Sequence, residues 1–198
     1  MSDLDVWENI LNGERLKVNV NFAAAFVLHY ECLKDFVISQ VRDFYCDIKV
    51  VDGEIVYQED LAYKKEVREL DKKVDNASLH WFVNSGAITE DDYLLYQEIR
   101  QKRNEIVHRF YDNLCNGFTE DDAKLFAKLI ELYKKLDKWW INEIEIPIAG
   151  DEIPDGYDSE SVCGGVSITL DIINDIIFSE NSEKYKDLLR KIRNVDNT

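Results

Sequence analysis

The chain has 198 residues, of which 45% are hydrophobic and 12% aromatic, enough to fill the core of one domain. Charged residues make up 32% of the chain, with a formal net charge of −16, and only two prolines and eight glycines occur, a composition that favours an all-α fold over a sandwich or a disordered tail. The acidic N-terminus does not resemble a signal peptide, and no apolar run approaches the roughly 20 residues that cross a bilayer, so we expect a cytoplasmic protein with no membrane partner.

The first half of the chain predicts a long helix and a β-hairpin. A short amphipathic segment precedes Gly13, and an apolar pattern of helical period then runs from about Asn21 to Tyr45. From Cys46 to Gln58 the pattern changes to two β-rich runs on either side of Asp52-Gly53, a pair that favours a type I′ turn. We therefore expect a small hairpin inserted into the helical bundle at about residues 46–58.

The region after the hairpin is expected to be helical only in part. Its charged residues predict a helix from about Glu59 to Val74. The following apolar residues, Leu79 to Val83, predict a short helical turn or a loop that buries Trp81 and Phe82.

Two threonine caps predict the starts of the next two helices. Each threonine precedes an aspartate by three residues, a variant of the capping box: Thr89 and Asp92, and Thr119 and Asp122. The first helix is expected over about Glu90–Leu114, before the helix-ending pair Asn116-Gly117, and the second over about Glu120–Ile144. Because the connection is short, the two helices should pack antiparallel.

The last part of the chain is acidic and then helical again. Both prolines fall within residues 145–165, which we interpret as a long acidic loop after the bundle of residues 1–144. Between Trp139 and Glu183 there are eleven acids and no Lys or Arg, so most of the excess negative charge belongs to this stretch. Two more helices, about Val166–Phe178 and Ser182–Asn194, form a C-terminal extension, residues 166–198, that is expected to pack on the same domain.

One charged side chain lies where an apolar one is expected. At ~100° per residue, Arg103 falls in the middle of the apolar stripe of the helix expected at 90–114. A guanidinium in that position is costly unless it is paired or opens into a cleft. Asn104 and His108 lie one turn apart on the adjoining flank, and His108 is ~140° from Arg103 by the same helical spacing. Joint action would therefore need Arg103 to reach around the helix, or a second chain.

The segment Arg103, Asn104, three further residues and His108 resembles the RX4–6H motif of the HEPN superfamily. The resemblance covers this helix and the surrounding helices, roughly Asn21 to Ile144. HEPN domains are helical bundles that commonly dimerise around two copies of the motif, and many are metal-independent endoribonucleases of toxin–antitoxin, abortive-infection and other anti-phage systems. The resemblance implies a homodimer that cleaves RNA without metal or cofactor, in prokaryotic defence or as a toxin, with an antitoxin or other protein as a further partner.

The same resemblance implies roles for individual residues. Attack by a 2′-hydroxyl needs proton transfer and positive charge near the phosphorus, so His108 would be the acid/base and Arg103 the phosphate clamp. Asn104 would orient His108 or a phosphate oxygen. Three neighbours would contact the substrate: Arg100, Arg109 and Tyr111. One HEPN toxin subgroup has a tyrosine two residues after the histidine, but Phe110 occupies that position here, so this subgroup is not indicated.

Other interpretations of the segment remain open. Arg103 could form an internal ion pair with an acid on a neighbouring helix and His108 could be an ordinary surface histidine. The domain would then be a non-catalytic HEPN-like module that binds a protein partner or nucleotide, or an unrelated helical bundle. A catalytic pair should instead open into one cleft, near its symmetry mates in a dimer. The four cysteines include no CxxC pair, and no Cys, His and carboxylate spacing indicates a metal site.

Overall fold

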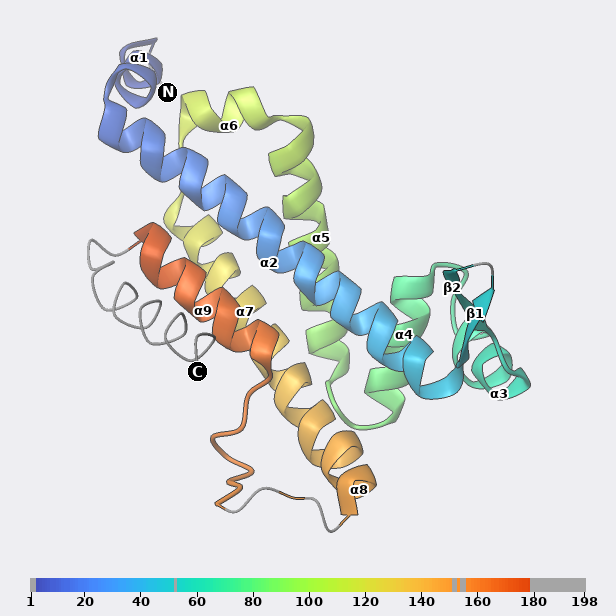
Figure 1. Ribbon diagram of the computed structural model, residues 1–198. Helices are drawn as coiled ribbons and strands as arrows, with labels where there is room; N and C mark the ends of the chain where they lie inside the picture. Colours follow the sequence, from blue (N-terminus) through green and yellow to red (C-terminus); the bar gives the residue numbers. More distant parts are fainter. Residues whose placement is uncertain (1–2, 52, 151–152, 154–155, 179–198) are drawn as a thin grey trace.

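The structure, a computed structural model, describes residues 3–51, 53–150, 153 and 156–178, and it is an antiparallel helical bundle with one β-hairpin (Figure 1). The all-α class expected from the sequence is thereby confirmed. The longest helix, α2, crosses the front of the molecule in this view, with α5 and α7 behind it and α9 beside it. No helix of the described ranges is both long and apolar enough to cross a membrane.

The chain begins with α1 (Asp3–Leu11) and the 33-residue helix α2 (Gly13–Tyr45). The side chain of Asn12 accepts hydrogen bonds from the backbone N–H groups of Glu14 and Arg15 and so caps α2. This cap explains why α2 begins about two turns before the expected start at Asn21. At 1.5 Å per residue α2 is about 50 Å long, which makes it the element on which the other helices pack.

The hairpin consists of β1 (Asp47–Val51) and β2 (Glu54–Gln58), which pair antiparallel with Val51 opposite Glu54. Gly53 has φ +83°, in the left-handed region that a type I′ turn requires. The hairpin expected at residues 46–58 is therefore confirmed, and it projects from one end of α2 (Figure 1).

The region after the hairpin differs from the expectation. It forms a short helix α3 (Leu61–Tyr63) and a π-helical turn η1 (Lys64–Arg68), and then α4 (Val74–Asn84). The Asp71 carboxylate accepts a hydrogen bond from the backbone N–H of Lys73 at 2.7 Å, a local bond that competes with helix formation and separates the two pieces. The prediction of a continuous helix to Val74 was wrong. Of the two alternatives for Leu79–Val83 the helical one is confirmed, within the longer α4, and Phe82 is buried whereas Trp81 is partly buried.

The two predicted caps are confirmed at the starts of α5 (Glu90–His108) and α7 (Glu120–Trp140), where both threonines form complete capping boxes. Two ion pairs join the helices. Lys102 contacts Asp122 at 2.6 Å and Lys135 contacts Asp92 at 2.6 Å, so the end of each helix lies beside the start of the other. The helices are therefore antiparallel, as predicted.

The helix expected at residues 90–114 is not continuous. It breaks at Arg109, where φ −122° and ψ 36° leave the helical region, and α6 (Phe110–Asn116) runs in a new direction. Figure 1 shows α6 turning toward α1. The side chain of Asn9 on α1 donates to the carbonyl oxygen of Cys115 at 2.9 Å, and Cys115 is buried. Packing against α1 and α2 thus overrides a pattern that would support one longer helix.

The chain after α7 remains helical through a π-helical turn η2 (Ile141–Glu145) and a short α8 (Ile146–Ala149), so the predicted loop begins later than residue 145. The next helix, α9 (Gly165–Phe178), matches the prediction closely. The buried Asp137 carboxylate on α7 accepts hydrogen bonds from the Gly164 N–H at 2.7 Å and the Ser167 hydroxyl at 2.6 Å, which holds the start of α9. The helix predicted at Ser182–Asn194 lies outside the described residues.

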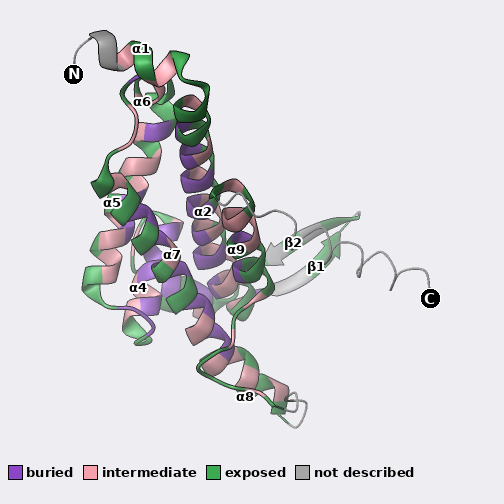
Figure 2. Cartoon of the chain, turned by 90° about the vertical axis from the view of Figure 1, so that its left-hand side faces the viewer, coloured by how far each residue is buried: buried purple, intermediate pink, exposed green. Residues whose placement is uncertain are grey.

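The core lies between α2, α4, α5 and α7, and the buried residues in Figure 2 line their facing sides. Fully buried members come from all four helices: Phe26, Leu33, Val37, Leu79, Phe82, Tyr96, Ile99, Ile106, Leu129 and Leu136. This core fixes the middle of α5 and places the residues on its edge and at its C-terminal end at the surface.

Candidate functional site

Arg103 is half-buried between α5 and α2. One guanidinium nitrogen, Nη2, forms an ion pair with Glu31 of α2, and the guanidinium carbon lies 5.5 Å from the centre of the Tyr30 ring, a cation–π contact. The side chain remains 27% exposed, and that of Glu31 is 41% exposed. The positive charge that the sequence places in the apolar stripe is thus paired with an acid of the neighbouring helix. Arg103 itself lies at the edge of the core.

The hydrogen-bond donors of Arg103 are only partly satisfied by other groups of the protein. Nη1 donates to the Asn104 side-chain oxygen at 3.1 Å. Nε is buried and has no hydrogen-bond partner among the described residues. An unsatisfied donor on a charged group costs free energy, and an acceptor such as a phosphate oxygen would relieve this cost.

Asn104 is exposed and in contact with Arg103, whereas His108 lies farther along. His108 is the last residue of α5 and is exposed. Arg103, Asn104 and His108 line none of five well-formed surface hollows among the described residues. A single chain therefore brings Arg103 and Asn104 together, but it does not enclose them with His108 in one cleft.

Arg100, one of the residues predicted to contact substrate, has its guanidinium already occupied. Nη1 contacts the Asp75 carboxylate at 2.7 Å and donates to the Asn76 side-chain oxygen at 3.1 Å, while Nη2 donates to Gln97. The Asp75 side chain is only 12% exposed. These contacts give Arg100 a role in joining α5 to α4.

The other two predicted contacts, Arg109 and Tyr111, lie at the break between α5 and α6. Arg109 forms an exposed ion pair with Asp112 at 3.1 Å, and Tyr111 is 73% exposed. Because α6 changes direction, Tyr111 does not continue the flank of Asn104 and His108 as a single helix would require. Apolar side chains of the same corner are also exposed, Val107 at 44% and Phe110 at 43%.

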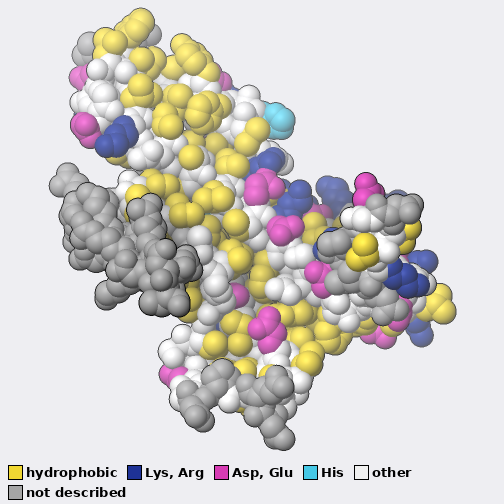
Figure 3. Space-filling view, viewed as in Figure 1, with side chains coloured by type: hydrophobic (Ala, Val, Ile, Leu, Met, Phe, Trp, Pro, Cys, Tyr) yellow, Lys and Arg dark blue, Asp and Glu magenta, His cyan; other side chains and the backbone are white. Residues whose placement is uncertain are grey.

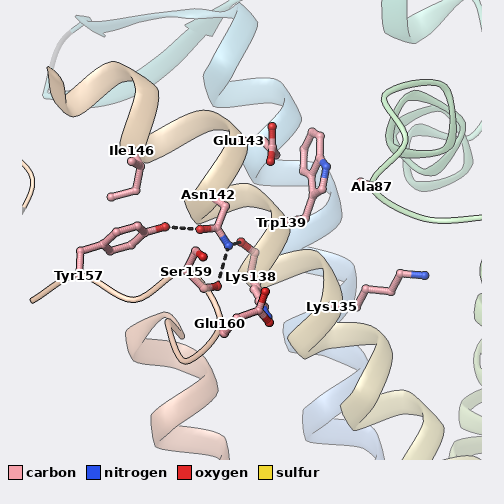
Figure 4. A pocket seen from close by; sticks show the side chains of 10 residues that line it. All are labelled: Ala87, Lys135, Lys138, Trp139, Asn142, Glu143, Ile146, Tyr157, Ser159 and Glu160. Carbon is pink, nitrogen blue, oxygen red and sulfur yellow. Dashed lines mark hydrogen bonds and ion pairs between the residues drawn. The ribbon is translucent and has the colours of Figure 1, made fainter.

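A separate hollow of about 530 Å³ lies at the other end of the bundle, between α7, η2 and the segment 157–160 (Figure 4). Figure 4 shows the Tyr157 hydroxyl and the Ser159 carbonyl both bonded to the Asn142 side chain. The two lysines that line the hollow are already in ion pairs, Lys135 with Asp92 and Lys138 with Glu160. This hollow therefore holds the acidic segment against α7 and offers no unpaired cation from α7 to a ligand.

The sequence did not identify Glu31 and Tyr30 as partners of Arg103, because nothing in the spacing says which acid of a neighbouring helix meets it. Among the residues that the structure describes, no group of three or more His, Cys, Asp and Glu side chains could hold a metal ion. All four cysteines are free thiols, and Cys46 and Cys115 are buried. No protein family, curated protein or solved structure matches the chain.

Proposed function

We propose that the protein is a HEPN-type, metal-independent endoribonuclease that acts as a homodimer in prokaryotic defence or as a toxin. The observation that supports this proposal best is the arrangement at the end of α5, where Arg103 contacts Asn104 and His108 lies exposed one turn beyond Asn104. These are the residues of the motif that the sequence resembles, and all three keep surface that a substrate can reach.

The homodimer is needed because one chain leaves the site incomplete. Val107, Phe110 and Tyr111 present exposed apolar surface beside His108, and Figure 3 shows further hydrophobic side chains at this end of the molecule, over α1, α2 and α6. Burial of such surface between two copies would be favourable at about 25 cal/mol per Å². A two-fold interface at this corner would place two copies of His108 and Arg103 around one strand of RNA.

The proposed chemistry is transfer of the phosphodiester bond within the RNA. A 2′-oxygen forms a bond to phosphorus, the bond to the 5′-oxygen breaks, and the products carry a 2′,3′-cyclic phosphate and a 5′-hydroxyl. One His108 accepts the proton of the 2′-hydroxyl, and the second copy donates a proton to the departing 5′-oxygen. Arg103 provides positive charge and a planar pair of donors for the phosphate oxygens as negative charge develops.

Replacement of His108 tests this proposal. Purified wild-type protein should cleave single-stranded or structured RNA in EDTA and leave 2′,3′-cyclic phosphate ends. His108→Ala should lower the rate at least about 100-fold, the lower limit for loss of a general acid–base group. His80→Ala is the matched control, since it removes a partly exposed histidine from α4, away from the motif. Cleavage that is unchanged in His108→Ala would remove His108 from the mechanism.

The ion pair between Arg103 and Glu31 favours a second candidate, a non-catalytic helical module that binds a protein partner or nucleotide. In that case Arg103 would serve mainly to join α5 to α2. RNA binding without cleavage by the wild-type dimer, or no interaction with RNA at all, would support this candidate over the nuclease.

A further inference from the structure

A second basic surface lies beside α5, on the segment that joins η1 to α4. It surrounds a hollow of about 590 Å³ whose lining includes Arg68, Lys72, Lys73 and Asn76. We propose that this hollow binds phosphate groups of the RNA strand whose scissile bond reaches the motif on α5. The proposal rests on the proposed function. It adds a second surface, outside the motif, along which the RNA strand binds.

The cations of this hollow are not neutralised by the protein. Arg68, Lys72 and Lys73 have no ion-pair partner in the part of the chain that the structure describes, although acids greatly outnumber bases in the sequence. The lysines Lys102 and Lys135 are instead paired with acids of the opposite helix. Unpaired cations close together raise the local positive potential and attract a polyanion.

Two acids also line the hollow, and one of them is already engaged. Asp71 accepts the backbone N–H of Lys73, and this bond holds the pKa of Asp71 below its ordinary value. Glu69 is the other acid of the lining and is exposed. The segment 64–73 contains five Lys and Arg and three acids, so its charge remains positive.

The donors of the hollow point to an anion rather than to a neutral ligand. Nη1 of Arg68 is buried and has no hydrogen-bond partner among the described residues. The first turn of α4 has no side-chain cap at Lys73, and although the Asp75 carboxylate accepts the Asn76 N–H at 3.0 Å, the positive end of the helix dipole lies at the hollow. A phosphate oxygen would accept the free donor of Arg68 and would be favoured by the helix dipole.

Asn76 connects the hollow to the motif-bearing helix. Its side chain is buried, lines the hollow, and accepts hydrogen bonds from Arg100 at 3.1 Å and Gln97 at 3.2 Å. Arg100 lies one helical turn before Asn104, and two turns, about 12 Å, separate it from His108. Figure 3 shows several Lys and Arg side chains between α5 and the hairpin, with Asp and Glu side chains among them. A strand of a few nucleotides therefore suits this surface better than a single phosphate does.

The test measures RNA binding by a variant that should not cleave the RNA. A labelled single-stranded RNA of 20 nucleotides is titrated with full-length His108→Ala protein, with and without Lys72→Gln and Lys73→Gln. Both lysines are exposed, so the fold should tolerate the changes. We expect affinity to fall roughly tenfold and the slope of log affinity against log salt to fall by about 1.4, for two phosphate contacts at about 0.7 each. The control, Lys124→Gln with Lys128→Gln, removes the same charge from the exposed face of α7 and should change affinity less than about twofold.

The outcomes separate this proposal from the proposed function. Unchanged RNA binding in the Lys72 and Lys73 variant would contradict RNA binding at the hollow, even if cleavage requires His108. Loss of RNA binding in that variant would support RNA binding at the hollow, even if cleavage proves independent of His108. Inorganic phosphate is titrated as a second probe. If the two lysines affect phosphate binding but not RNA binding, the hollow is a small-anion site and the strand path is wrong.

Discussion

The contacts of Arg103 both help and hinder its proposed role as a phosphate clamp. The ion pair with Glu31 and the ring of Tyr30 orient the guanidinium, and the same carboxylate occupies one of its donors. A phosphate that approaches Arg103 must therefore compete with Glu31. The sequence could predict that the charge of Arg103 needs an ion-pair partner, because Arg103 falls in an apolar stripe. It could not identify the acid, because that depends on how α2 and α5 cross.

Replacement of Glu31 measures this competition. Glu31→Gln keeps the shape of the side chain and removes its charge, so RNA affinity should rise several-fold, while the free energy of unfolding falls by no more than about 1 kcal/mol for a partly exposed pair. Fluorescence anisotropy and thermal unfolding check the two effects. Asp35→Asn, one turn along α2, is the control for loss of a negative charge. Equal effects of the two substitutions would show that Glu31 acts only through the net charge.

At the scale of elements, local signals were predictable and tertiary ones were not. The caps at Thr89 and Thr119 and the turn at Gly53 depend on neighbours in the sequence, and all three are present. The break at Arg109 depends on the packing of α6 against α1, which the apolar pattern of residues 90–114 does not encode. As a result, the sequence correctly placed Arg103, Asn104 and His108 on one helix but wrongly extended that helix to Tyr111, which lies in α6.

The contact between α2 and α9 predicts a pH effect on stability. His29 is buried under α9, where Nδ1 donates to the Ala25 carbonyl oxygen at 2.8 Å and Nε2 accepts from the Asn174 side chain at 3.0 Å. Burial lowers the pKa of His29 from 6.5, against smaller raising effects of the Ala25 carbonyl and Asp171, and Lys134 lowers it further. At pH 7 the imidazole is thus neutral in the folded state.

The sign of the effect follows from this lowered pKa. As pH falls below 6.5, the unfolded chain binds a proton at His29 before the folded chain does, so the protein loses stability. The free energy of unfolding, measured by urea denaturation, should fall between pH 7 and pH 5.5 by up to about 1.4 kcal/mol for each unit of separation between the two pKa values. His29→Gln should reduce this dependence and His80→Gln should not. An unchanged dependence in His29→Gln would assign the effect to other groups.

At the scale of the whole molecule, the charges are arranged unevenly. Acids gather in the stretch after Trp139, and part of this stretch is bonded to Asn142 of η2, whereas the unpaired cations lie near the start of α4. A net charge of −16 therefore does not describe the surface that RNA would meet. This separation is what makes a polyanionic substrate compatible with an acidic chain.

The proposed dimer is tested at the same scale. Val107→Asp places a charge in the exposed apolar corner and should convert a dimer to a monomer in sedimentation or light-scattering measurements, with loss of cleavage. Leu94→Asp is the matched control, since Leu94 is also exposed on α5 but lies far from the break. A wild-type monomer that cleaves RNA at concentrations where no dimer is detected would contradict the shared site.

The hydrogen bond from Asn9 to the Cys115 carbonyl has a practical consequence for experiments on this protein. It holds α1 against α6, so α1 lies at the same end of the molecule as the break after His108 (Figure 1). A purification tag or fluorescent fusion placed ahead of α1 would be next to the surface on which a second copy is proposed to dock. Such a tag should be cleaved off before oligomeric state or nuclease activity is measured.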